Sequence, residues 1–182
     1  VFGMIADHVG SRQIDRHLPH RLFDHAGRRL PTGTGFLRTM RTEVNGIQRR
    51  ACFAEQSTQF GVNLTMMKNE FNAIAATPPL VPNAKLTTTA RNHSQWMLAN
   101  NSQSHNEGTV TPYNRMTNIG YSYTYAAENI YAYSSSVEFS HAGFEVDWGS
   151  GGTGGMQAGR GHRVNIHSAN FREIGVGVVL GG

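Results

Sequence analysis

The amino-acid sequence predicts an α+β protein in which helices surround a sheet. Segments with apolar residues at helical spacing alternate irregularly with strand-like segments, and long loops separate them, an order that disfavours a doubly wound parallel fold. The chain has 21 glycines and 38% apolar residues, a composition that suits a loop-rich protein with one core. No run approaches the roughly 18 apolar residues of a membrane-spanning helix.

Two amphipathic helices are expected at the start of the patterned region. The first follows the spacing of Leu64, Met67, Phe71 and Ile74. It ends at Thr77-Pro78, because the residue before a proline avoids the helical conformation. The second covers residues 86–100 and carries one stripe made of Leu86, Ala90, His93 and Met97. We interpret His93 on this stripe as a hydrogen-bonded core residue.

Shorter elements follow along the chain. Thr111-Pro112 predicts a short helix to about residue 118, since threonine caps helices and proline suits their first position. Residues 121–133 are rich in tyrosine and isoleucine and are expected to be partly extended. A further helix starts at Ser135 or Ser136. Residues 149–161 form a glycine-rich loop, and residues 175–180 predict a buried strand.

The charge is distributed unevenly and suggests a boundary. Residues 1–50 hold nine Arg against four acidic residues (+5), whereas residues 51–182 hold seven basic against eight acidic residues (−1). We therefore expect residues 1–55 to be a basic N-terminal extension, poorly ordered or peripheral, and residues 56–182 to be the folded domain. No specific binding of nucleic acid is expected. No signal peptide is recognised at the start of the chain, and this absence does not make the protein cytosolic.

The glycine-rich loop contains a formal G-x-G-x-x-G pattern over residues 149–154. A dinucleotide-binding loop follows a buried strand and opens a helix, whereas this one follows an expected helix. We therefore interpret it as a connector and expect no nucleotide cofactor.

Two histidines and the acidic residues between them form a candidate site. His105 follows the second helix and His162 precedes the final strand, while Glu128, Glu145 and Asp147 lie between them. If these side chains converge on one cleft, the histidines can bind a divalent metal while the carboxylates orient them. The same set can instead act as an acid–base pair. From spacing alone, scattered polar residues are the alternative.

Four runs in the second part of the chain carry a family likeness. They are Trp96-Met97 with Asn100-Asn101 and Ser104-His105; Pro112-Tyr113-Asn114-Arg115-Met116 with Gly120-Tyr121; Ala127-Glu128-Asn129-Ile130; and Gly161-His162-Arg163-Val164-Asn165-Ile166 with Asn170-Phe171-Arg172-Glu173-Ile174-Gly175-Val176-Gly177. In this order they resemble a bacterial domain of the CAP superfamily, the SCP-like fold of cysteine-rich secretory, antigen 5 and pathogenesis-related 1 proteins. The likeness covers roughly residues 60–180, and the four runs together are specific.

The resemblance implies a three-layer α-β-α sandwich with a small central antiparallel sheet over residues 56–182. The family usually adds one more strand after the point where this chain stops, at Gly181-Gly182. Either the domain lacks its last strand or the sheet is completed differently.

The resemblance also implies a large cleft lined by two histidines and two acids. The histidines carry over to His105 and His162, and the first acid to Glu128. Family members often have an aromatic residue three positions before the second acid, which selects Asp147, with Glu145 as the runner-up.

The resemblance finally implies a function outside the cell. We expect a secreted or extracellular ligand-binding or interaction module that can bind Zn²⁺ or another divalent metal through His105 and His162. Its ligand would be a small molecule, lipid, glycan or peptide, and the protein would be a monomer or weak dimer. The alternative is a metal-dependent hydrolase, peptidase- or esterase-like, that uses a metal-bound water with Glu128 and Asp147 as catalytic carboxylates. Whether it is an enzyme stays open.

Overall fold

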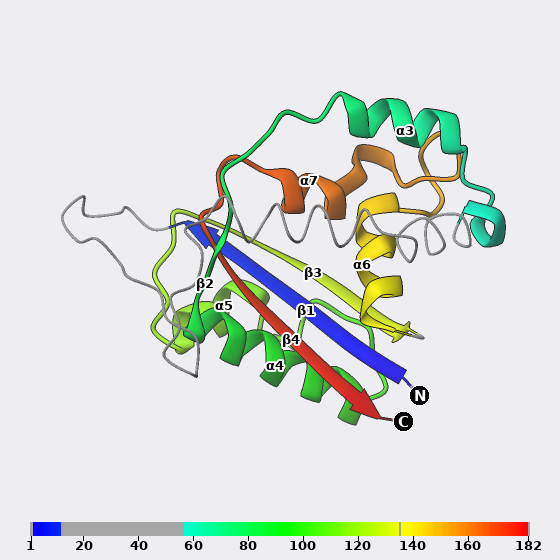
Figure 1. Ribbon diagram of the computed structural model, residues 1–182. Helices are drawn as coiled ribbons and strands as arrows, with labels where there is room; N and C mark the ends of the chain where they lie inside the picture. Colours follow the sequence, from blue (N-terminus) through cyan, green and yellow to red (C-terminus); the bar gives the residue numbers. More distant parts are fainter. Residues whose placement is uncertain (1, 12–56, 135, 182) are drawn as a thin grey trace, which may run out of the picture.

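The computed structural model describes residues 2–11, 57–134 and 136–181. The named elements are β1 (Phe2–Ser11), α3 (Leu64–Asn72), β2 (Val81–Pro82), α4 (Ala84–Ala99), α5 (Pro112–Asn118), β3 (Tyr125–Ser134), α6 (Val137–Val146), a 3₁₀ turn (Ala158–Arg160), α7 (Gly161–His167) and β4 (Glu173–Gly181) (Figure 1). In this described part of the chain, no helix combines the length and hydrophobicity needed to cross a membrane.

Side-chain caps fix where the helices begin. Asn83 accepts hydrogen bonds from the backbone amides of Lys85 and Leu86, so α4 starts two residues earlier than its apolar stripe predicted. Thr111 caps α5 with Pro112 in the first turn, and Ser136 caps α6, as the sequence predicted for both. Each cap satisfies amides that have no partner within the helix.

Helix α7 was not predicted from the sequence. It has only seven residues, and of these only Arg163 is buried. Its sequence therefore contains no stripe of buried apolar residues that would indicate a helix. The chain enters it through Arg160, whose backbone adopts the left-handed conformation with φ 51°. His162, expected simply before the final strand, therefore lies in the first turn of a helix.

The sheet has the strand order β2-β4-β1-β3. Strand β1 pairs antiparallel with both β3 and β4, whereas β2 pairs in parallel with β4. The expectation of an antiparallel sheet is therefore wrong: the sheet is mixed. The parallel pair is short because β2 has two residues and ends in Pro82, which has no amide to donate and suits an edge.

The N-terminal residues occupy an unexpected place. Residues 2–11, assigned above to a peripheral extension, form the strand between β4 and β3 (Figure 1). Phe2 pairs with Gly181, so the two ends of the chain lie at the same end of the sheet. The position between β4 and β3 is thus filled by an N-terminal strand. Residues 12–56 lie outside the described residues, and the proposed boundary near residue 55 stays a prediction.

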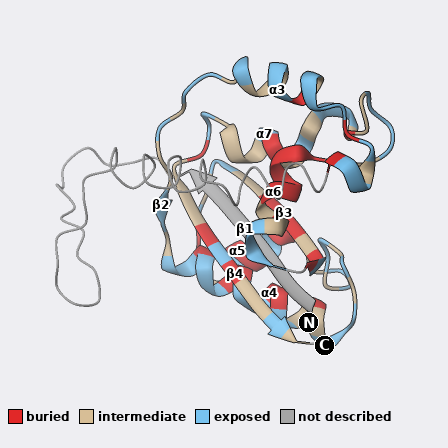
Figure 2. Cartoon of the chain, turned by 45° about the vertical axis from the view of Figure 1, so that its right-hand side comes forward, coloured by how far each residue is buried: buried red, intermediate tan, exposed pale blue. Residues whose placement is uncertain are grey.

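Helices contact both faces of β3. Ile130 and Ala132 pack with Ala90 and Met97 of α4 in one buried cluster. On the other face, the ring of Tyr131 contacts Phe144 of α6 edge-on, with 5.8 Å between ring centroids. Figure 2 shows the buried residues concentrated along the inner sides of these elements.

Glycines allow α4 to lie against β4. A Cβ atom at Gly175 would come within 2.0 Å of the backbone of Leu86, and one at Gly177 within 2.2 Å of the backbone of Arg91. Any side chain at these positions would force the helix away from the strand. This close approach determines the distance between α4 and the sheet, and it therefore also positions the loop that follows α4.

Candidate functional site

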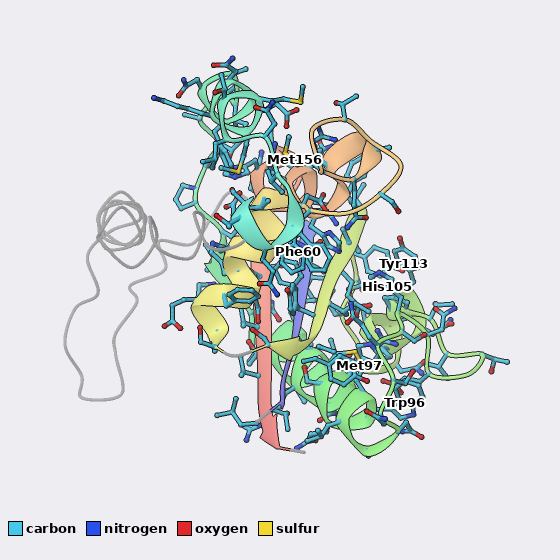
Figure 3. The ribbon with its side chains drawn as sticks, turned by 90° about the vertical axis from the view of Figure 1, so that its right-hand side faces the viewer. Phe60, Trp96, Met97, His105, Tyr113 and Met156 are labelled. Carbon is cyan, nitrogen blue, oxygen red and sulfur yellow. The ribbon has the colours of Figure 1, made fainter. Side chains whose placement is uncertain are left out.

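His105 lies in the loop between α4 and α5, and its side chain hydrogen-bonds to Glu128 of β3. Its side chain is 52% exposed, and its Nδ1 lies 2.8 Å from Oε1 of Glu128, whose side chain is 2% exposed. An ionised carboxylate only accepts hydrogen bonds, so Nδ1 carries a proton, and in the neutral imidazole the lone pair is then on Nε2. Figure 3 shows His105 on the side of the sheet that α4 and α5 cover.

Arg115 compensates the buried charge of Glu128. Its Nη2 lies 2.5 Å from Oε2 of Glu128, and its Nη1 donates to the backbone carbonyl of His105 at 2.9 Å. Its Nε lies 3.6 Å from Oε1 of Glu107. Arg115 therefore joins α5, β3 and the His105 loop. Arg115 was not predicted as a site residue, although a charged side chain within a short capped helix was a possible signal.

His93 lies beneath the same loop and is fully buried. Its Nδ1 is 2.8 Å from Oε1 of Glu107 and its Nε2 is 2.9 Å from the carbonyl oxygen of Ser104. Burial lowers the pKa of His93, while the nearby carboxylates of Glu128 and Glu107 act in the opposite direction. The prediction of a hydrogen-bonded core histidine is confirmed.

His162 forms a second histidine–carboxylate pair with Asp147. Its Nδ1 lies 2.7 Å from Oδ1 of Asp147, and its backbone amide donates to Oδ2 at 3.0 Å. Asp147 is completely buried and ends α6 in the left-handed conformation, with φ 55°. The exposed fraction of the His162 side chain is 27%, and its ring stacks on Phe144. The left-handed turn directs Asp147 to the start of α7.

Glu145 takes part in a different contact. Its Oε2 lies 2.8 Å from Nε2 of His167, and its Oε1 lies 3.8 Å from Nε2 of His141. The structure therefore places Asp147, and not Glu145, against His162. The shorter aspartate side chain reaches the imidazole because the left-handed turn brings the two residues together.

Neighbouring residues of β3 connect the two histidine–carboxylate pairs. Glu128 accepts from His105, and Asn129 donates through Nδ2 to the carbonyl oxygen of His162 at 3.2 Å. Asn129 is itself held by Asn165 of α7 at 2.8 Å. The structure thus joins His105 to Glu128 and His162 to Asp147. That both rings line one cleft stays a prediction.

The available donors limit what the site can hold. Within residues 2–11, 57–134 and 136–181, no group of three or more His, Cys, Asp or Glu side chains is arranged to bind a metal ion. The carboxylates of Glu128 and Asp147 each hydrogen-bond to the Nδ1 atom of an imidazole, that of His105 and that of His162 respectively. The two Nε2 atoms are therefore the donors that the pairs leave for an external ligand.

The model of the CAP family, described as the cysteine-rich secretory protein family, matches residues 66–182, more than half of the chain. No curated protein and no solved structure matches it. The matched region includes both histidine–carboxylate pairs.

Proposed function

Because the chain belongs to the CAP, or cysteine-rich secretory protein, family, we propose that it is an extracellular ligand-binding module that holds a divalent cation such as Zn²⁺ at His105 and His162. Membership suggests an extracellular interaction or ligand-binding role. The cation and its two histidine ligands are the more specific part of the proposal.

The proposal depends chiefly on the orientation of the two exposed imidazoles. In each pair Nδ1 is directed at a buried carboxylate, at 2.8 Å in His105 and 2.7 Å in His162. A carboxylate on Nδ1 fixes the tautomer and makes Nε2 more basic, which is the usual arrangement of a metal-binding histidine. Both side chains are also accessible to solvent, whereas their carboxylates are not.

Two imidazoles supply only part of a coordination shell. Zinc usually takes four ligands, so water or a bound ligand would have to complete the shell. We therefore expect weak, exchangeable binding that is lost as the imidazoles become protonated. A bound cation would offer an open position to an oxygen or nitrogen atom of a small molecule, lipid, glycan or peptide.

The hydrolase alternative is less well supported by the contacts of the two acids. A metal-dependent hydrolase needs one group that activates water and another that protonates the leaving group. Glu128 already accepts from His105 and from Arg115, and Asp147 accepts twice from His162. We infer that these carboxylates orient the histidines, and we favour the binding function.

We also propose the finer features that accompany this assignment. They are a secreted protein of the bacterial, SCP-like type, a three-layer arrangement of helices about the sheet, a monomer or weak dimer, and no specific nucleic-acid partner. The near-neutral charge of residues 51–182 supports the last of these.

Zinc titration of four proteins tests the proposal. Wild type should bind zinc weakly, and His105→Ala and His162→Ala should each reduce the affinity about tenfold or more. His167→Ala is a matched control, because the Nε2 of His167 is already paired with Glu145. Equal binding by all four proteins would exclude the site.

A substrate screen separates the two functions. With added zinc, the wild-type protein should turn over peptide and ester substrates no faster than the Glu128→Gln variant does. This substitution keeps the shape of the side chain but removes its charge. Turnover that this substitution abolishes would favour the hydrolase.

A further inference from the structure

The loop that carries His105 is built from two small turns. Ser104 and Asn106 form one turn, in which the Ser104 hydroxyl donates to the Asn106 carbonyl and accepts from its amide. Glu107 and Val110 form the other through two backbone hydrogen bonds of 2.9 and 3.0 Å. His105 lies within the first turn, next to the junction between them.

The buried His93 side chain contacts both turns. Its Nε2 contacts the Ser104 carbonyl in the first turn, and its Nδ1 contacts the Glu107 carboxylate in the second. The carbonyl oxygen can only accept, so Nε2 donates to it, while Nδ1 lies within hydrogen-bond distance of the Glu107 carboxylate. The His93 ring thus connects Ser104 to Glu107, the residues on either side of the segment that contains His105.

We propose that His93 is a positioning residue for His105. This inference rests on the proposed function, because it assigns His93 the task of holding the loop so that Nδ1 of His105 stays against Glu128 and Nε2 stays directed outward. His93 is completely buried and therefore does not contact the ligand itself. Arg115 fixes the His105 carbonyl in the same loop, so the backbone is held on both sides of the imidazole.

Three substitutions separate the two contacts of His93. Glutamine places an amide near the position of Nε2 and can keep the Ser104 contact, while asparagine places one near Nδ1 and can keep the Glu107 contact. Leucine keeps the bulk and removes both. Ser94→Ala is the matched control, because the neighbouring, equally buried Ser94 donates its side-chain hydrogen bond to the Gly177 carbonyl on β4.

Hydrogen exchange of residues 104–107, measured without metal, is the first readout. Exchange should rise about tenfold in His93→Leu and by a smaller factor in His93→Gln and His93→Asn, while Ser94→Ala lowers Tm and leaves the loop unchanged. A two-bond ¹H–¹⁵N NMR spectrum should show the Nδ1–H tautomer of His105 in wild type and a mixture of tautomers in His93→Leu.

Zinc titration is the second readout, with an affinity loss of about ten- to a hundredfold expected for His93→Leu. Loop exchange and a His105 tautomer that match wild type in His93→Leu would overturn the proposal, as would an equal change in Ser94→Ala. If wild type fails to bind zinc, the proposed function fails, while the metal-free exchange and NMR data still decide the role of His93.

Discussion

Replacing Arg115 by methionine should destabilise the protein by about 3–5 kcal/mol, the usual cost of breaking a buried ion pair by removing one partner. The side chains of Arg115 and Glu128 are only 6% and 2% exposed, so water cannot replace the guanidinium around the carboxylate. Methionine fills the volume of the arginine stem, which limits the loss of packing. The dominant effect is the uncompensated charge of Glu128.

The double variant Arg115→Met/Glu128→Gln identifies the source of this cost. Glutamine can still accept the hydrogen bond from Nδ1 of His105, but no buried charge is left without a partner. Glu128→Gln alone should cost about 1–3 kcal/mol, since Arg115 keeps the His105 carbonyl and the Glu107 carboxylate. The double variant should therefore be more stable than the sum of the single effects predicts, by about 2 kcal/mol.

Urea denaturation followed by tryptophan fluorescence measures all four free energies of unfolding. The m-values should agree, so that midpoints can be compared directly. A loss below about 1 kcal/mol for Arg115→Met, or strict additivity in the double variant, would refute the argument that Arg115 neutralises a buried carboxylate.

Three further predictions concern the fold. Hydrogen bonding from Arg160 lowers the pKa of Glu70, so Glu70 stabilises the folded state above its unfolded pKa and loses this effect as pH falls through the folded value. Thermal unfolding should show Glu70→Gln less stable by about 1 kcal/mol or less at pH 7, with a difference that shrinks as the pH falls below the ordinary pKa of a glutamate. Ala6→Pro should cost about 3 kcal/mol or more in urea denaturation because β1 is central, and an unchanged midpoint would place this strand elsewhere. Gly177→Ala should cost about 1–3 kcal/mol in the same assay, whereas Gly161→Ala, whose new Cβ meets no atom within 4 Å, should be close to neutral.

Local signals in the sequence predicted most helix positions. Thr111-Pro112 and Ser136 are caps whose partners lie within three residues, so their effect can be read without knowledge of the fold. The final strand was found from its run of β-branched residues, but the prediction that it is buried was wrong, because Val176 and Leu180 are exposed. Helix α7 was missed because its stability comes from tertiary contacts such as that of Arg163 with the carbonyl of Val146.

Long-range pairing could not be predicted in the same way. Residues 2–11 become central through pairing with strands more than 110 residues away, and no local pattern in this glycine-containing segment indicates a partner. The site shows the same limit. The residue pattern suggested His105 and His162 with three acidic residues, and the resemblance selected Glu128 and Asp147 among these acids. The supporting Arg115 contact depends on three elements that meet only in the folded chain.

A crystal grown or soaked with zinc, with anomalous diffraction data, tests the central claim most directly. We expect one anomalous peak about 2.1 Å from Nε2 of both His105 and His162, with Nδ1 of each ring still paired with Glu128 or Asp147. Zinc bound at Glu145 and His167 instead, or two rings too far apart to share one ion, would contradict it.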